Sequence, residues 1–264
     1  MTNADLTAYS ATASLRRVRL IAGQTLAEAL RLRLTVLFVL TGMMLVVMAL
    51  WLREFNFGTA ELKFIGDFGL GVIGLLGTLL AALVTAHLFF SDVMGAAIGC
   101  VLSRRVRRWE YIGGKLAGVM ALLALFVATL ALVLAVVIAA RATQLGALFV
   151  PLLVFLQACA LVWLKLTLVA AMTLLVCSYA GTALFASCAG LLLALIANLR
   201  PFTDAGDGLS LLRLWPNLGL FDVEALLAGS ELTGAGLLAL TGYWAVFMLL
   251  FGGLASYVFK HREF

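Results

Sequence analysis

Long apolar runs, each about the length of a membrane-crossing helix, repeat along the chain. A bilayer core about 30 Å thick is crossed by roughly 20 helical residues at a rise of 1.5 Å each. The sequence holds enough nearly charge-free runs of this length for six helices. The predicted membrane spans are 34–52, 68–90, 113–140, 150–177, 182–199 and 235–259. The pattern therefore predicts an all-α, polytopic membrane protein.

The fourth and fifth predicted spans come from one apolar region, 148–199, whose single charge is Lys165. Ser and Gly interrupt this region at 178–182, so the turn between the two spans is expected there. Lys165 then lies about 18 Å deep, since about 12 helical residues separate it from the end of its span. A charge at that depth is costly and marks a functional position, either a transport path or a dimer interface. The alternative is a shallower lysine whose ammonium reaches the membrane surface.

A polar helix is predicted ahead of the first span, over residues 14–33. One face of it is mostly apolar, and the opposite face carries charged and amide side chains. The first face holds Leu15, Val18, Ala22, Thr25, Leu26 and Ala29, and the second holds Arg17, Gln24, Glu28 and Arg31. Such a pattern is typical of a helix that lies in the membrane surface, with its basic residues toward lipid head groups. The alternative is a solvated extension of the first span.

Composition agrees with a membrane protein. Hydrophobic residues make up 64% of the 264 residues and charged residues only 12%, whereas a soluble domain is about half apolar and a quarter charged. A water-soluble protein of this length cannot cover its surface with so few charges. The composition thus excludes a soluble enzyme, a disordered chain and a nucleic-acid-binding domain, despite the net charge of +5.

The basic residues predict the orientation of the chain in the membrane. With the N-terminus inside, 12 of the 18 Lys and Arg residues lie on the cytoplasmic side and five on the outside, with Lys165 in the membrane. This asymmetry satisfies the positive-inside rule and places both termini in the cytoplasm. The first thirty residues are too polar for a cleaved signal peptide. We expect a cytoplasmic tail and interfacial helix over 1–33, followed by one transmembrane domain over 34–264.

Sequence signals for catalysis or cofactor binding are missing. The closest string to a phosphate-binding loop, Gly113-Gly114-Lys115-Leu116, has Leu where a hydroxyl residue belongs and lacks the upstream glycine. The two histidines lie on separate segments, and no acid falls inside a predicted span. The chain is therefore expected to have no enzymatic activity, metal or cofactor of its own, and no carboxylate-based ion pathway.

The segment between the second and third spans carries the strongest chemical signal. Four arginines occur within five positions, at Arg104, Arg105, Arg107 and Arg108, and Trp109 and Glu110 follow. A polybasic loop at this place can bind anionic lipid head groups. The other interpretation is a docking element for a cytoplasmic partner protein.

This segment resembles the first cytoplasmic loop of ABC-2-type transporter permeases. That family has an acid at the end of the second span, a short helix, a Leu-Ser-basic-Pro turn leading to an Arg-aromatic-acid-aromatic string, and Gly-Lys at the start of the third span. The matching residues are Asp92, Leu102, Ser103, Arg104, Arg108, Trp109, Glu110, Tyr111, Gly114 and Lys115. The external string 214–222 and the ending 259–264 are also similar to the family. The nearest branch is the permeases grouped with multicopper enzyme maturation.

The resemblance implies a permease in a bacterial cytoplasmic (inner) membrane that couples ATP hydrolysis by a separate ATPase to export of an unidentified substrate. ATP and Mg would bind to the cytoplasmic ABC ATPase subunits. A second permease copy, or a divergent paralogue, would complete the membrane part within the lipid bilayer. The implied ATPase-coupling loop contains Asp92, Leu102, Ser103, Arg104, Arg105, Arg107, Arg108, Trp109 and Glu110. The turn at 178–182 would add a smaller contact.

Departures from the family pattern fall in this loop. Asp92 replaces the usual Glu, Ala97 the usual Thr, and Arg105 the usual Pro. We therefore hypothesise that the chain is the divergent half of a heteromeric permease pair. A second class of function is a membrane scaffold or assembly subunit that transports nothing, and a membrane enzyme acting on lipid is disfavoured by the missing acid and histidine clusters.

Two packing features are also predicted. Gly69, Gly71, Gly74 and Gly77 are expected to let the second span pack closely on another helix. In the external segment 200–234, residues 218–227 carry Phe221, Val223, Leu226 and Leu227 among acids. They predict a short helix resting on the outer face of the membrane.

Overall fold

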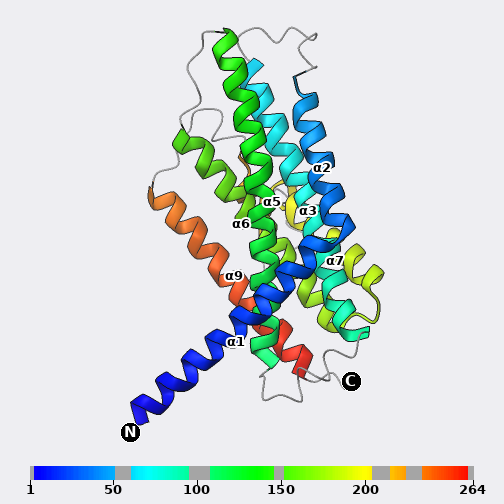
Figure 1. The fold of residues 1–264 in the computed structure, drawn as a ribbon, viewed down its shortest axis with the longest axis vertical. Helices are drawn as coiled ribbons and strands as arrows, with labels where there is room; N and C mark the ends of the chain where they lie inside the picture. Colours follow the sequence, from blue (N-terminus) through cyan, green and yellow to red (C-terminus); the bar gives the residue numbers. More distant parts are fainter. Residues whose placement is uncertain are drawn as a thin grey trace.

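The computed structural model describes residues 3–50, 61–94, 108–145, 152–203, 215–223 and 234–260. All regular structure within these ranges is helical, which confirms the predicted all-α class. The helices are α1 (Asn3–Arg31), α2 (Arg33–Met48), α3 (Glu61–Met94), α5 (Arg108–Leu145), α6 (Leu152–Tyr179), α7 (Ala183–Thr203), the 3₁₀ helix η4 (Leu218–Phe221) and α9 (Gly234–Lys260). Figure 1 shows them in one elongated bundle.

Within the described residues, four helices are long and apolar enough to cross a membrane. They are the central parts of α3, α5, α6 and α9. The pair α1 and α2 would add a fifth crossing if it forms one span, although it is bent by 65° at Leu32. The apolar part of α7, Ala183–Leu199, is shorter. Each of the six predicted spans thus overlaps a helix, and four or five long apolar helices are compatible with a multi-pass membrane protein.

Helix α6 occupies the centre of the bundle. Nearly every residue from Leu161 to Leu174 is buried, because α6 packs on α3, α5, α7 and α9. Two indole N–H groups join it to its neighbours: Trp163 donates to the Met120 carbonyl of α5 at 3.1 Å, and Trp244 of α9 donates to the Thr167 hydroxyl at 2.8 Å. A helix surrounded in this way is apolar on all sides, which explains why its sequence has no polar face.

The turn predicted at 178–182 is confirmed. Helix α6 ends at Tyr179 and α7 begins at Ala183. The hydroxyl of Thr182 accepts a hydrogen bond from the backbone N–H of Phe185 at 3.3 Å, so Thr182 caps the start of α7. The cap and the exposed Gly181 explain why the apolar region divides at this point.

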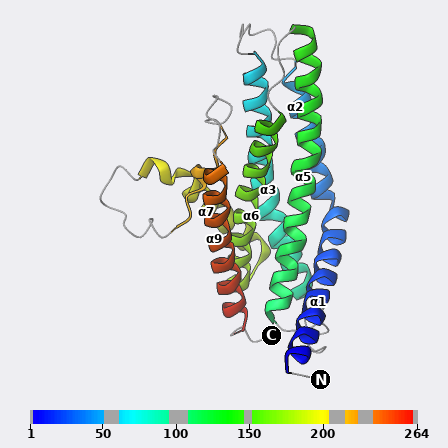
Figure 2. The same ribbon diagram turned by 90° about the vertical axis from the view of Figure 1, so that its left-hand side faces the viewer.

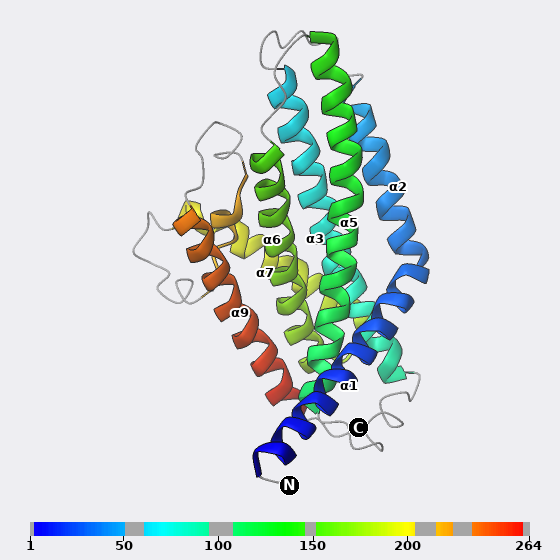
Figure 3. The ribbon, with the colours of Figure 1, turned by 60° about the vertical axis from the view of Figure 1, so that its left-hand side comes forward.

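The helix predicted over 14–33 is present as α1, but its apolar face contacts protein. In Figure 3 α1 runs across α5 and then bends into α2. A Cβ atom on Gly114 of α5 would lie 2.8 Å from the Ile21 side chain, and one on Gly118 would lie 2.8 Å from the Ala22 carbonyl. The two glycines, four residues apart, thus let the two helices approach closely. Leu15, predicted on the buried face, is 69% exposed instead.

The four glycines predicted to bring α3 against another helix divide into two pairs. A Cβ on Gly69 would lie 2.4 Å from Leu134 of α5, and one on Gly77 would lie 2.5 Å from Leu166 of α6. These two positions make close packing, as predicted. At Gly71 and Gly74 a Cβ would meet nothing within 4 Å, so the close-packing prediction is wrong for this pair.

The chain ends of the bundle lie together. The first turn of α1 and the last turn of α9 are at the same end, as Figures 1 and 2 show. The last turn of α3 and the first turn of α5 are also at this end, on either side of the segment 95–107. The residues of the predicted coupling loop that the structure describes are therefore at the end of the bundle that carries both chain ends.

The contact between α1 and α5 gives a direct test. Replacing Gly114 with Val should lower the free energy of unfolding by about 1–3 kcal/mol, because the new side chain overlaps Ile21. Gly113→Val is the matched control, since a Cβ at Gly113 meets nothing within 4 Å and both variants share the same change in helix propensity. Unfolding in detergent micelles measures both. Equal destabilisation by the two variants would show that α1 does not pack here.

Candidate functional site

The ends of α3 and α5 are joined by a group of polar side chains, here called the loop-base cluster: Asp92, Glu110, Tyr111 and Lys115. The Asp92 carboxylate accepts a hydrogen bond from the Tyr111 hydroxyl at 2.6 Å, and its same oxygen forms an ion pair with the Lys115 ammonium. Tyr111 and Lys115 are four residues apart, so they share one face of α5 and both reach the same carboxylate. The cluster therefore lies at the two helix ends that flank residues 95–107 in the sequence.

The Lys115–Asp92 pair is largely removed from solvent. The Lys115 side chain is 2% exposed and that of Asp92 is 23% exposed. An ammonium buried to this extent loses several kcal/mol of hydration, which only a well-placed counter-charge can offset. The pair therefore holds the last turn of α3 against the first turns of α5.

Glu110 ties α1 into the same region. Its carboxylate is 1% exposed, accepts a hydrogen bond from the Ser14 hydroxyl, and forms an ion pair with Arg17 at 3.3 Å. A second link runs from the Ser91 hydroxyl of α3 to the Glu28 carboxylate of α1 at 2.8 Å. Polar side chains thus join three helices, α1, α3 and α5, at the end where the basic segment begins and ends.

An aromatic wall adjoins the loop-base cluster. The Tyr111 ring stacks on Phe259 of α9 with centroids 5.8 Å apart, and Phe89 of α3 meets Phe259 edge-on at 5.9 Å. All three side chains are buried. Because these contacts bring in the last turn of α9, the base of the segment 95–107 is connected to four helices.

The predicted coupling residues divide between described and undescribed parts of the chain. Asp92 and Glu110 lie in the loop-base cluster. Trp109 is at the same end and is 49% exposed. Arg108 is the first residue of α5. The side chain of Arg108 and the residues Leu102, Ser103, Arg104, Arg105 and Arg107 lie outside what the structure describes.

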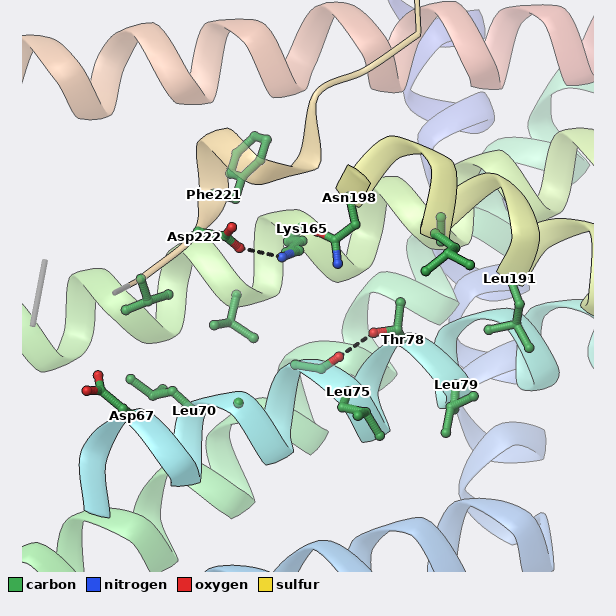
Figure 4. Close-up of a pocket in the computed structure, with 16 residues that line it drawn as sticks. Asp67, Leu70, Leu75, Thr78, Leu79, Lys165, Leu191, Asn198, Phe221 and Asp222 are labelled. Carbon is green, nitrogen blue, oxygen red and sulfur yellow. Dashed lines mark hydrogen bonds and ion pairs between the residues drawn. The ribbon is translucent and has the colours of Figure 1, made fainter. Parts of the chain in front are cut away.

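A second polar site surrounds Lys165, in the middle of α6. Its ammonium forms an ion pair with the Asp222 carboxylate at 2.7 Å, with side chains 16% and 57% exposed respectively. Figure 4 shows the two side chains joined across the space that they share with Asn198, on the side opposite Asp67 and Thr78 of α3. The partner of Lys165 is therefore supplied by this chain.

Asp222 is held at this position by the 3₁₀ helix η4. Leu218 and Phe221 are fully buried against the bundle. The Asn217 side chain accepts from the Gly219 N–H at 3.0 Å, and the Asn217 N–H donates to the Tyr243 hydroxyl of α9 at 2.7 Å. The predicted short helix is thus present over Leu218–Phe221, where its apolar side chains contact protein, and residues 224–227 of the prediction lie outside the described residues.

A cavity of about 610 Å³ lies beside the Lys165–Asp222 pair, between α3, α6, α7 and η4. Its polar lining includes Asp67, Thr78, Lys165, Asn198 and Asp222. Its walls are otherwise apolar, and Gly71 and Gly74 line it from α3. The missing side chains of these two glycines make part of the space.

Two pairings were missed by sequence reasoning. Lys115 was noted beside a glycine at the start of a span, without a counter-charge, and Asp222 was assigned to an external loop. The sequence signal that could have indicated these pairings is the high cost of burying an unpaired charge. A lysine in an apolar helix favours an acidic partner from another segment. Choosing that acid among 13 needs the fold. Within the described ranges, no group of three or more His, Cys, Asp or Glu side chains could hold a metal ion.

Comparison with models of protein families and with curated proteins finds no match to this chain. The arguments about function therefore depend on the residues and on their geometry.

The Lys115–Asp92 pair can be tested by a double-mutant cycle. Asp92→Asn should destabilise the protein by about 3 kcal/mol, because the buried Lys115 ammonium loses its counter-charge. Adding Lys115→Met should recover most of that loss, since no charge is then left buried. Unfolding of the four proteins in detergent micelles gives the coupling free energy. A double variant whose loss equals the sum of the two single losses would contradict the pairing.

Proposed function

We propose that this chain is the membrane-spanning permease subunit of an ABC transporter, coupling ATP hydrolysis by a separate ATPase subunit to translocation of a substrate. The observation that supports the proposal best is the loop-base cluster. Asp92, Glu110 and Lys115 fasten the ends of α3 and α5, which flank residues 95–107 in sequence, to each other and to α1. A loop mounted on a stiff base can pass a displacement into the helices, whereas a loose loop would absorb it.

The arginines of this segment give the proposed contact its chemistry. Arg104, Arg105, Arg107 and Arg108 directly precede Trp109 and Glu110 in the sequence. Guanidinium groups pair bidentately with carboxylates, so acidic side chains on a cytoplasmic ATPase are suitable partners. The ATPase would bind ATP and Mg, and the permease would contribute no catalytic group.

The proposed arrangement in the membrane follows from the basic residues. All six predicted spans would cross, with α1 near the membrane surface and both chain ends in the cytoplasm of a bacterium. Helix α2 would supply the first crossing and α7 the fifth. Lys165, with Asp222, would lie on the outer part of the transport path in the cytoplasmic membrane.

The arginines can be tested through ATPase capture. Replacing Arg104, Arg105, Arg107 and Arg108 by Ala should reduce the ATPase that co-purifies with the chain from native membrane by about tenfold or more, as expected when charge-assisted hydrogen bonds are lost. The control is Ala at Arg16, Arg19 and Arg31, which are exposed on α1. A fall in binding to anionic vesicles with unchanged ATPase capture would contradict docking. A complex with no ATPase at all would favour the scaffold alternative.

The departures at Asp92, Ala97 and Arg105 lead to a prediction about stoichiometry. If the chain is the divergent half of a pair, the complex purified from native membrane should contain one copy of it, one different permease chain and two ATPase subunits. Native mass spectrometry of the intact complex measures this composition. Two copies of this chain with no second permease would overturn the heteromer and leave the permease proposal standing.

A further inference from the structure

We propose that the cavity beside Lys165 binds the head group of a zwitterionic membrane lipid, one that carries a primary ammonium and a phosphate. The inference depends on the cavity alone and holds whether or not the chain is a transporter subunit. At about 610 Å³ the cavity lies within the range of roughly 300–1,000 Å³ that is usual for small-molecule sites.

Lys165 supplies the group that would bind the phosphate. A lysine ammonium has three N–H donors. In the described part of the chain, its one hydrogen bond goes to Asp222. Two donors therefore remain for an acceptor-rich ligand, and Asn198 lines the same space from α7 with its side-chain amide. A phosphate offers the oxygens that these donors require.

The charges around the cavity favour a ligand that also carries an ammonium. Among the lining residues that the structure describes, Lys165 and Asp222 form an ion pair that is neutral as a unit. An anionic ligand would add an unmatched negative charge beside this pair, which is costly in a partly enclosed space. A zwitterion adds no net charge, and its primary ammonium can donate to the Asp222 carboxylate, which is 57% exposed.

The cavity also borders an apolar surface, which favours a lipid over a free zwitterion. Leu75 of α3 and Leu195 of α7 both line the cavity, and they are 63% and 54% exposed on the surface of the chain. Leu70, Leu79 and Leu191 continue the apolar lining inward. Acyl chains can lie along the exposed leucines while the head group reaches Lys165, whereas a water-soluble zwitterion gains nothing from them.

Lipid binding to the purified full chain tests the proposal. Native mass spectrometry should show phosphatidylethanolamine bound about tenfold more tightly than phosphatidylglycerol, which lacks the ammonium, and phosphatidylcholine, whose quaternary ammonium has no N–H to donate. Soluble glycerophosphoethanolamine has the same head group without acyl chains and should not compete at equal concentration. Equal binding of the three lipids would overturn the proposal. Effective competition by the soluble compound would show that the site does not require acyl chains and would overturn the assignment of the ligand as a lipid.

Variants locate the binding in the cavity. Gly74→Leu should weaken phosphatidylethanolamine binding about tenfold or more, because the new side chain enters open space that the head group would occupy. Gly253→Leu on α9 is the matched control, since its Cβ also meets nothing within 4 Å and it lies outside the cavity lining. Unchanged binding in Gly74→Leu would overturn the site.

Two further variants keep the test independent of folding at Gly74. Gly71→Leu fills the same cavity from the preceding turn of α3 and should give the same loss. Asp222→Asn should abolish the preference for phosphatidylethanolamine over phosphatidylcholine, because the carboxylate that accepts from the ligand's ammonium is lost. Residual binding should remain, because Lys165, released from its ion pair with Asp222, still donates to the phosphate. A preference retained in Asp222→Asn would overturn the assigned role of this carboxylate.

Discussion

A charge placed among apolar helices must be matched by a side chain from another helix, because no water is present to hydrate it. The buried ammonium of Lys115 shows how far this constraint shapes the chain. Its counter-charge, Asp92, comes from the end of α3, and the neighbouring Glu110 takes its partners from α1. Each pairing joins segments that are distant in sequence, so a few polar residues decide how otherwise interchangeable apolar helices are arranged at this end of the bundle.

Glycine has two opposite roles in the same bundle. Gly114 and Gly118 bring α5 against α1, and Gly69 brings α3 against α5, since a side chain at any of them would overlap a neighbour. Gly71 and Gly74 face open space and widen the cavity next to Lys165. The residue type alone therefore does not tell whether a glycine allows close helix packing or widens a cavity. The outcome depends on whether a neighbouring helix is in contact with the glycine.

The apolar pattern was sufficient to predict the helices, because helix length and composition are local properties that the bilayer dimensions restrict. The turn at 178–182 was also predictable, since the Thr182 cap and Gly181 are local signals. The partner of Lys165 was not, because Asp222 lies 57 residues away in a segment whose apolar residues equally suit a membrane surface or a bundle interior. For the same reason the sequence did not reveal the protein contacts of η4 and of one face of α1.

The two polar sites share one rigid element. Helix α3 is continuous from Glu61 to Met94 and carries Gly74 at the cavity and Asp92 at the loop base. These residues are 18 positions apart, or about 27 Å at helical rise.

Asp92 is fixed to α5 by a buried ion pair, so in the proposed transporter a displacement of the segment 95–107 would move α3 and α5 together. The part of α3 that carries Asp67 and Gly74 faces α6 and α7 across the cavity. The same displacement would therefore change the separation between Asp67 and the Lys165–Asp222 pair. Under this mechanism the cavity need not contact the ATPase, because the stiffness of one helix suffices to connect them.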